Sequence, residues 1–344
     1  MGDCTKPKGG RTMRYIGLDI HKKHTQACIR NEDGKILSGE RFKTEADDIA
    51  SFFAKQEAHG PLSVTMEATG FYFWIHDFIV ARGHPVIVVH PARIKPLMKA
   101  KAKNDRNDAS MLAELLRTGC LEGIYVPPPE IREMRDLTRH RESLVRKKGD
   151  LKREIISSLD QHGVMTPSNY RVSFTKKYIK WLRSLNDFVI NEKLDLLEAT
   201  VSKIQNVERL IEERWGEDED VQIIRSVPGI GLVTATVIKA ELGDVARFPS
   251  AENLAAYIGV SPTTFQSGEK EWGGPVRHGN SRVKHVLIEA ALVHTRSCPD
   301  SKISRYHFRK RESIGGAKAA VATGRKLSEA IYFMLVRRQP FHAH

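Results

Sequence analysis

The order of strand-like and helix-like segments in the N-terminal part of the chain constrains its fold most strongly. Two strand patterns separated by a short polar stretch occupy residues 14–30, and a turn at Asp33-Gly34 leads into a third strand. Helical and strand patterns then alternate. An antiparallel meander followed by this alternation predicts a mixed sheet flanked by helices. The alternating segments are a helix over 44–57, a strand over 62–69, a helix over 71–83 and a strand over 84–90.

The middle of the chain, residues 130–215, is highly charged but keeps a periodic apolar pattern. Leucines recur at intervals of seven at Leu137, Leu144 and Leu151, and a second periodic run surrounds Val201. These patterns predict two long helices that pack on each other as an antiparallel hairpin or coiled coil. Two solvated helices without a partner are the alternative, which is weaker because the apolar seam would then face water.

A glycine-rich turn, Pro228-Gly229-Ile230-Gly231, precedes the next helical run. Such a turn is either an ordinary tight connection or a helix-hairpin-helix-like element that directs backbone N–H groups toward a phosphate. Thr234 stands where a dinucleotide fingerprint requires its third glycine, and the chain has no P-loop motif. We therefore expect no nucleotide cofactor.

These patterns together predict the α/β plus α class, with five parts along the chain. They are a disordered lead at 1–13, an α/β domain at 14–128, a long helical arm at 129–220, a mainly helical C-terminal domain at 221–335 and a tail at 336–344.

The chain of 344 residues is strongly basic, with 55 lysines and arginines against 42 aspartates and glutamates and a pI near 9.5. From Gly268 to the C-terminus there are 15 basic against 6 acidic residues. Because each lysine or arginine that meets a phosphate releases a condensed counterion, this charge favours nucleic acid as the partner. A soluble basic protein without such a partner is the alternative.

Cysteine spacing and hydropathy exclude several other classes. The four cysteines, at residues 4, 28, 120 and 298, are far apart and form no C-x-x-C pair, so neither a zinc site nor a disulfide framework is indicated. No apolar run is long enough to span a bilayer, and the first dozen residues lack a hydrophobic signal core. We expect a protein of the cytoplasm that does not enter a membrane.

Four acidic residues stand where the patterns do not require a charge. Asp19 ends the first apolar strand and Glu67 ends the strand pattern "LSVTME", so both lie where a strand leaves the core. Asp105 and Asp108 share one helical face because they are three residues apart. An N-terminal helix turn, which favours negative charge, explains the last two acids equally well. Taken together, the four oxygen donors favour a site for one or two Mg²⁺ or Mn²⁺ ions.

Basic side chains and glycines near these segments are the expected contacts to phosphate, with a solvated surface as the alternative. They are Lys99, Lys101, Lys103, Arg106, Gly229, Gly231, Arg277, His278, Arg282 and Lys284.

Several segments of the chain resemble one family. The strand "IGLDIHKKHTQACI", the segment "MEATGFYFWIHDFI", the strand exit "VVHPARIKPL" and "KNDRNDA" resemble the N-terminal domain of the DEDD transposases, the insertion sequence one-ten family. The segments "VPGIGLVTATVIKAELGDVARFPSAENLAAYIGVSPTTFQSG" and "HGNSRVKHVLIEAALVH" resemble its C-terminal half. The family also resembles the Piv and MooV invertases. The similarity covers roughly residues 14–335.

This resemblance implies an RNase H-like (RuvC-like) fold and a catalytic tetrad at Asp19, Glu67, Asp105 and Asp108. It also implies a nucleophilic serine in a Ser-Gly step, which is Ser267 in "TFQSGEK", a segment that the sequence alone indicates to be a polar loop. Many members have two glycines and an arginine further on, where this chain has "HGNSR", so Arg282 is the nearest equivalent. Members act on donor and target DNA under the direction of a structured guide (bridge) RNA, and a homo-oligomer, a dimer or tetramer, is expected.

We therefore expect a site-directed DNA recombinase of a mobile element, in which Ser267 would attack a phosphodiester and leave a 5′-phosphoserine and a free 3′-hydroxyl. Three alternatives to this recombinase differ in their predicted behaviour. A RuvC-like nuclease that uses water would cleave DNA without a covalent adduct, and Ser267 would be an ordinary residue. An actin-like ATPase would bind nucleotide, but the sequence "DIHKK" after the first strand lacks the phosphate loop of that class. A non-enzymatic nucleic-acid-binding protein would show salt-dependent binding without cleavage.

Overall fold

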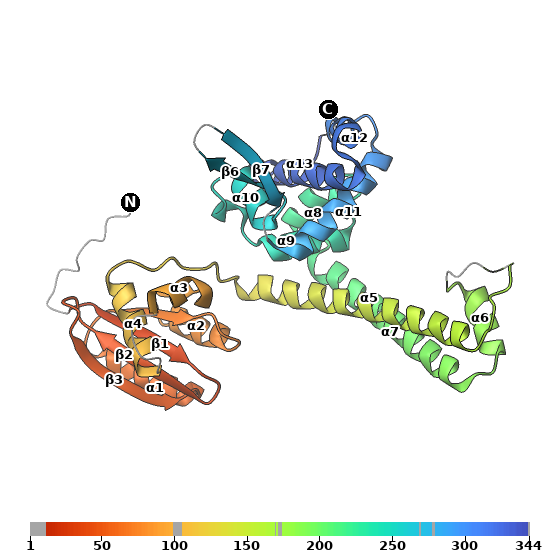
Figure 1. Ribbon diagram of the computed structural model, residues 1–344. Coiled ribbons are helices and arrows are strands. Elements are labelled where there is room, and N and C mark those ends of the chain that lie inside the picture. Colours follow the sequence, from red (N-terminus) through yellow and green to blue (C-terminus); the bar gives the residue numbers. More distant parts are fainter. Residues whose placement is uncertain are drawn as a thin grey trace. The chain divides into compact units, whose positions relative to one another are not determined.

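The computed structural model describes residues 12–98, 105–168, 170, 174–267, 270–276 and 279–342, with side chains for all of these except 95–98 and 262–276. The chain forms two compact units, Met1–Val126 and Pro127–His344 (Figure 1). The predicted disordered lead at 1–13 lies almost wholly outside the described residues.

The first unit contains a five-stranded mixed sheet in the order β3-β2-β1-β4-β5. Strand β2 is antiparallel to both β1 and β3, whereas β4 is parallel to β1 and β5 is parallel to β4. The mixed sheet that the segment order predicts is therefore confirmed. The strands are β1 (Arg14–Ile20), β2 (His24–Arg30), β3 (Ile36–Lys43), β4 (Leu62–Glu67) and β5 (Val86–Val89).

Four helices accompany this sheet within the described part of the unit: α1 (Ala46–Glu57), α2 (Tyr72–Ala81), α3 (Pro91–Met98) and α4 (Asp105–Arg117). The sequence patterns predict α1 and α2, but α3 was not expected from them. Its first residue is Pro91, whose fixed φ angle suits the first position of a helix and whose missing N–H donor costs nothing there.

The strands alternate between two faces of the sheet. Ile16 and Leu18 of β1 pack with Val64 and Met66 of β4 and with Phe53 of α1, in the core that also contains α2. Because successive side chains point to opposite faces, Gly17 and Asp19 lie on the other face. That face is covered by α4, whose Ala109 and Ala113 pack on Cys28. The acidic end of β1 therefore faces α4.

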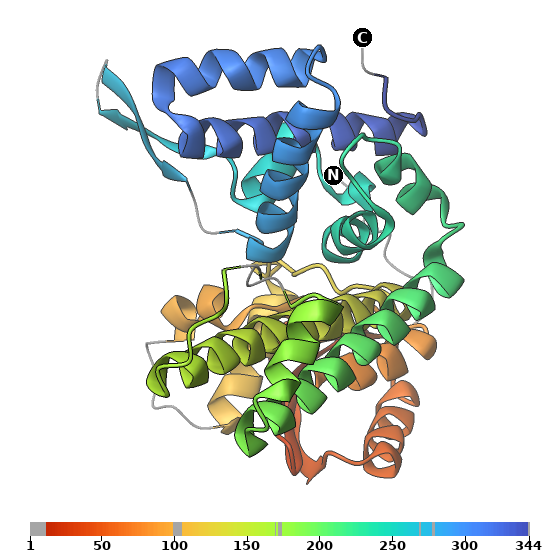
Figure 2. The ribbon, with the colours of Figure 1, turned by 90° about the vertical axis from the view of Figure 1, so that its right-hand side faces the viewer.

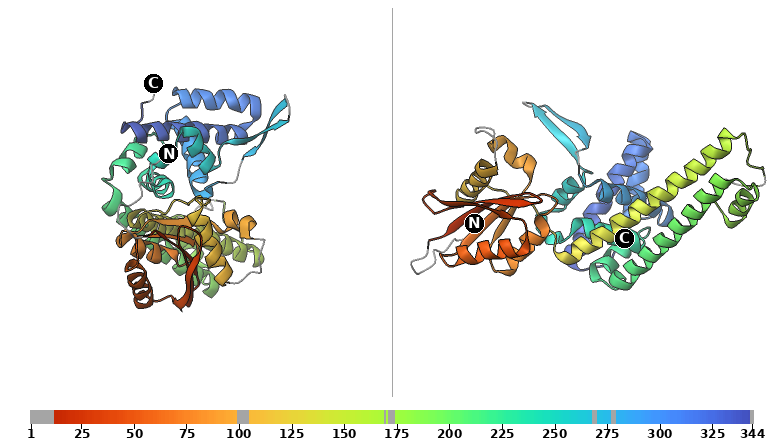
Figure 3. Two further views of the ribbon diagram at one scale, coloured as in Figure 1. Left: turned by 90° about the vertical axis from the view of Figure 1, so that its left-hand side faces the viewer. Right: turned by 90° about the horizontal axis from the view of Figure 1, so that it is seen from below.

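The second unit begins with two long helices, α5 (Pro129–Gln161) and α7 (Phe188–Trp215), with the short α6 (Lys176–Ser184) between them. Arg141 of α5 forms an ion pair with Glu208 of α7, whereas Glu154, further along α5, pairs with Lys193 near the start of α7. The helices are therefore antiparallel, as predicted, and they run side by side in the right-hand view of Figure 3.

The two ends of this helix pair belong to different apolar cores. Ile155 and Leu194 pack with Tyr178 of α6 at one end. Met134 and Trp215, at the other end, join the core of the C-terminal helices. The pair is thus continuous with the rest of the second unit.

The remainder of the second unit is mainly helical, and its helices α12 and α13 lie side by side (Figure 2). A two-stranded antiparallel sheet is inserted before α11. The elements are α8 (Glu219–Arg225), α9 (Leu232–Leu242), the 3-10 helix η1 (Val245–Arg247), α10 (Ala251–Ile258), β6 (Pro262–Ser267), β7 (Lys270–Val276), α11 (Ser281–Ser297), α12 (Lys302–Ile314) and α13 (Gly316–Arg337).

The predicted glycine turn connects α8 to α9, and Gly231 is the N-cap residue of α9. Gly229 has a φ angle of 99°, and a Cβ atom there would lie 2.8 Å from the backbone nitrogen of His294 on α11. The imidazole of His294, which is fully buried, in turn contacts the carbonyl oxygen of Pro228. Close packing on α11 is therefore sufficient to explain why a glycine occupies position 229. Within the described residues, no helix has the length and apolar character to cross a membrane.

Candidate metal centre

Asp19 and Glu67 lie at the carboxyl ends of two neighbouring parallel strands. In the register of β1 and β4, Leu18 lies opposite Met66, and each acid directly follows its member of that pair. Since Leu18 and Met66 both face the core with α1 and α2, Asp19 and Glu67 both lie on the face toward α4. Only 16% of the Asp19 side chain is exposed.

Helix α4 approaches the sheet closely enough to bring its first turn to these strand ends. A Cβ atom at Gly17 would overlap the backbone of Ala109 and Ala113, so glycine is needed where β1 crosses under α4. Asp105 and Asp108 occupy the first turn of this helix. Both carboxylates act electrostatically on Asp19, which shows that the three acids share one neighbourhood.

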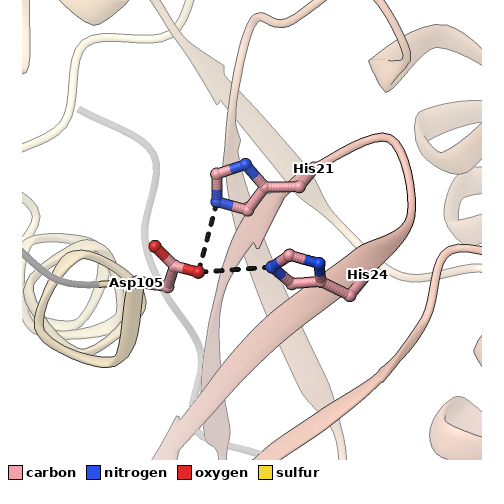
Figure 4. Close-up of side chains that lie close together, drawn as sticks. All are labelled: His21, His24 and Asp105. Atoms are coloured by element: carbon pink, nitrogen blue, oxygen red, sulfur yellow. Dashed lines mark hydrogen bonds and ion pairs between the residues drawn. The ribbon is translucent and has the colours of Figure 1, made fainter.

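Two histidines contribute to the same cluster (Figure 4). They flank the short connection between β1 and β2, where His21 N–H donates to the carbonyl oxygen of His24. His21 Nε2 lies 3.1 Å from Asp19 Oδ2 and 3.5 Å from Asp105 Oδ2. His24 Nε2 lies 3.3 Å from the same Asp105 oxygen. His21 therefore connects Asp19 at the strand end to Asp105 at the helix start, and His24 adds a second contact to Asp105.

The electrostatic environment differs between the two acids. Burial raises the pKa of Asp19, and the charges of Asp105 and Asp108 raise it further, although the contact with His21 opposes them. The hydrogen bond with His24 lowers the pKa of Asp105, helped by the charges of His21, His24 and Arg41. Burial and the two neighbouring carboxylates outweigh His21 at Asp19, and a divalent cation would stabilise a carboxylate in such surroundings.

Asp19, Asp105 and Asp108 therefore lie in one neighbourhood, and Glu67 ends the adjacent strand on the same face, whereas the histidines were not selected from the sequence. Asp105 and Asp108 do begin a helix, so the helix-start explanation describes their local structure correctly. It leaves the proximity of Asp19 unexplained. The signal for the histidines was their position directly after an acid-ended strand, in "DIHKKH", where a tight connection must return both side chains to the same strand ends.

The expected phosphate contacts have varied surroundings. Arg106 is exposed on α4, whereas Arg282 on α11 donates from Nε to Glu142 Oε2 on α5 at 2.7 Å. Lys284 is half-buried, and a Cβ atom at Gly231 would meet nothing within 4 Å. Lys99, Lys101, Lys103, Arg277 and His278 lie outside the described residues.

The segment around Ser267 is a strand rather than the expected loop. Ser267 is the last residue of β6 and pairs with Lys270, the first residue of β7. Glycine at three positions of "SGEKEWGG" suggested a loop, but Gly273 and Gly274 lie within β7. The side chain of Ser267 is outside the described part of the structure.

Asn280 and Gly279 fix the chain where it leaves this hairpin. A Cβ atom at Gly279 would overlap the backbone at Ile258 and Gly259, and Asn280 caps α11 and donates to Glu241 Oε2 at 2.9 Å. Glu241 is 2% exposed. The hairpin that carries Ser267 therefore begins and ends on the helical core.

Comparison with known proteins shows the family to which the chain belongs. Residues 16–164 match a model of DEDD-type transposases, and residues 221–307 match the model described as transposase of the IS116/IS110/IS902 family. The protein y4qE of Sinorhizobium fredii, which is also named as a transposase, is 31% identical over 304 residues, 83% of this chain and 74% of its own length. The chain belongs to the IS110 family of transposases.

Two other relatives of this IS110-family transposase extend the similarity. The transposase for insertion sequence element IS1111A of Coxiella burnetii is 27% identical over 343 residues, which are 96% of this chain and 92% of the relative. The pilin gene-inverting protein of Moraxella bovis is 26% identical over 74% of both chains. The resemblance inferred from the sequence motifs is thus confirmed, and the protein is an enzyme of DNA transposition or recombination. The DEDD family also suggests that the enzyme depends on a divalent metal.

Proposed function

We propose that this transposase cleaves and rejoins DNA strands of an insertion sequence at the carboxylate centre of its first unit, with Ser267 as the nucleophile. The observation that carries the proposal is the electrostatic proximity of Asp19, Asp105 and Asp108. The register of β1 and β4 supports Glu67 as the fourth member. The sheet order β3-β2-β1-β4-β5 supports an RNase H-like fold for this unit.

The residues of the centre fit a Mg²⁺ or Mn²⁺ ion. Hard oxygen donors suit both ions, and the repulsion that raises the pKa of Asp19 would be relieved by positive charge. Asp19, Glu67, Asp105 and Asp108 would hold the metal. When bound, it would supply charge that stabilises the phosphate under attack and the departing oxygen.

Ser267 would join the chain covalently to DNA. Its hydroxyl oxygen attacks the phosphorus atom, the bond from phosphorus to the 3′ oxygen breaks, and a 5′-phosphoserine and a free 3′-hydroxyl result. The proton that serine loses is balanced by the proton that the 3′ oxygen gains. Reversal of this step with a second 3′-hydroxyl rejoins the strands, so ATP is not needed.

The basic charge of the chain supports a polyanionic partner. We infer that donor and target DNA and a structured guide RNA bind along basic surfaces, which include Arg106 and the positive segment after Gly268. Arg282 would have to exchange its ion pair with Glu142 for a phosphate. The glycine turn before α9 would offer backbone N–H groups as a helix-hairpin-helix-like element.

Two duplexes with two strands each would require a homo-oligomer, a dimer or tetramer, and the helical arm at 129–220 would provide the assembly surface. The domain at 14–128 would supply the metal centre, and the domain at 221–335 would supply the serine. The cleavage and rejoining of DNA would take place in the prokaryotic cytoplasm.

The experiment compares strand cleavage by Asp105→Asn and Asp108→Asn variants with cleavage by Asp47→Asn. Asp47 is an exposed acid in the first turn of α1, so it reproduces the helix-start position without the metal centre. We expect Asp105→Asn and Asp108→Asn to lose cleavage by at least about 100-fold, since a metal clamp contributes several kcal/mol to the transition state. Asp47→Asn should cleave like the parent chain. Full cleavage activity in a variant that carries both Asp105→Asn and Asp108→Asn would reject the proposed function.

A further inference from the structure

The histidine pair next to the carboxylates has no role in the function described so far. His21 and His24 direct Nε2 atoms at one oxygen of Asp105, and all three donor atoms lie within 4.8 Å of one another (Figure 4). The two imidazole rings are tilted by 31°, with centroids 4.8 Å apart. The rings thus converge from one side on a single carboxylate oxygen.

The distances between these donor atoms are those of ligands around one metal ion. Bonds of about 2.1 Å to nitrogen and oxygen place neighbouring ligand atoms about 3.0 Å apart at a right angle and about 3.4 Å apart at a tetrahedral angle. The observed separations are 3.1 Å from Asp19 to His21, 3.5 Å from His21 to Asp105 and 3.3 Å from His24 to Asp105. Little movement is therefore needed for His21, His24 and Asp105 to share an ion, and Asp19 lies beside them in contact with His21.

The backbone that carries the histidines is held in place by hydrogen bonds. The carbonyl oxygen of His21 accepts from the Thr44 hydroxyl at 2.8 Å, and the N–H of Thr44 donates to the carbonyl oxygen of Lys23. The Thr44 hydroxyl also contacts that of Thr25. The connection between β1 and β2 is thus fastened to the end of β3, so the imidazoles are positioned before any ligand arrives.

Nitrogen ligands change which ion a site selects. Mg²⁺ prefers oxygen donors and keeps much of its water, whereas imidazole suits first-row transition metals. We propose that His21 and His24 are metal ligands together with Asp105, and that they make this centre select Mn²⁺ and related transition-metal ions over Mg²⁺. This inference rests on the proposed metal centre but not on the chemistry of Ser267.

Direct ion pairing is the competing explanation. Protonated imidazoles can neutralise Asp105 without any metal, and the same distances would then be hydrogen bonds. In that case the histidines and a cation compete for the same carboxylate oxygen. Removing the histidines would then leave Mn²⁺ binding unchanged or strengthen it, whereas removing ligands weakens it.

The test is binding of Mn²⁺ alone to the full chain after treatment with EDTA, without DNA. Free Mn²⁺ is measured by electron paramagnetic resonance, and Mg²⁺ affinity follows from competition. The variants are His21→Gln, His24→Gln and the double variant, because the glutamine amide occupies nearly the position of Nε2. His59→Gln, at an exposed histidine of the same unit, is the control.

We expect the double variant to bind Mn²⁺ roughly 10- to 100-fold more weakly, with Mg²⁺ affinity changed by less than about threefold. His59→Gln should match the parent chain. Pulsed resonance of Mn²⁺ on the parent chain should detect coupling to imidazole nitrogen, a readout that does not depend on how any variant folds.

Tight Mn²⁺ binding without nitrogen coupling, and with unchanged affinity in the double variant, would overturn the inference and leave the carboxylate centre of the proposed function intact. Absence of divalent binding by the parent chain would overturn both.

Discussion

Gly17 of β1 and Ala109 of α4 lie in direct backbone contact, so closely that the structure leaves no room for a Cβ atom at position 17. Because Gly17 is two residues before Asp19 on β1, this contact packs α4 on the sheet next to Asp19. The position of Asp105 and Asp108 relative to the strand ends is therefore decided by a residue that carries no chemistry of its own.

Substitution of Gly17 should damage both stability and the metal centre. We expect Gly17→Ala to cost about 1–3 kcal/mol of unfolding free energy, as overpacked cores do, and to weaken Mn²⁺ binding because α4 must move. Gly39→Ala in β3 is the control, since a Cβ atom there would have only an ordinary contact, at 3.7 Å. Thermal unfolding and Mn²⁺ titration check both effects. A Gly17→Ala chain with unchanged Mn²⁺ affinity would show that the packing of α4 on β1 does not determine the geometry of the metal centre.

The contact between the buried Glu241 and the exposed Arg139 should stabilise the second unit. Burial acts to raise the pKa of Glu241, but hydrogen bonds from Arg139 and Asn280 hold it below its usual value. We expect Glu241→Gln to lower the unfolding free energy by about 1.5–3 kcal/mol, because a buried amide cannot accept the charge-assisted hydrogen bonds that Arg139 and Asn280 donate to the carboxylate. Glu142→Gln breaks the exposed pair with Arg282 and should cost under about 1 kcal/mol. Equal effects in urea titrations would contradict this ranking.

Glu57 should stabilise the first unit at neutral pH and should lose this contribution in acid. The hydrogen bond from Arg82 lowers the pKa of Glu57 from 4.5 to about 2, and a contact with His84 adds to it. A carboxyl group whose pKa is lower in the folded state stabilises the fold above its unfolded pKa and loses this contribution as the pH falls.

The difference in unfolding free energy between Glu57→Gln and the parent chain measures the contribution of this carboxylate. The variant should be less stable by about 1 kcal/mol at pH 7, and the difference should shrink as the pH falls from about 4.5 toward 2. Urea titrations across this range measure it. If the difference in unfolding free energy grew as the pH fell, the ionised form of Glu57 would not be the one that stabilises the fold.

Much of the architecture could be predicted because its signals are local. The alternation of Ile16, Leu18 and Ile20 with smaller or polar residues fixes which face of β1 is buried, and the turn at Gly34 fixes the meander. The seven-residue spacing of leucines predicted α5 in the same way. Such patterns depend on hydrophobic burial, which a single sequence displays directly.

The parts that could not be predicted depend on contacts between distant residues. Nothing near His24 indicates that Asp105, 81 positions later, lies 3.3 Å away. The strand character of Ser267 depends on its pairing with Lys270 of β7, which the glycine-rich, polar sequence around it does not reveal. The roles of the four acids and of Ser267 remain predictions, since proximity alone does not assign a reaction.

The most direct measurement is to trap and map a covalent protein–DNA adduct. The parent chain, Asp108→Asn and Ser267→Ala react with DNA from an element end, and the digested products are analysed by mass spectrometry. We predict a nucleotide-modified peptide containing "TFQSGEK" in the parent chain and none in either variant, with Ser267→Ala still binding metal. Modification at Ser261, Thr263 or Thr264 would mean that another residue of the same segment is the nucleophile. Efficient cleavage by Ser267→Ala without any adduct would contradict the account and identify a nuclease that uses water.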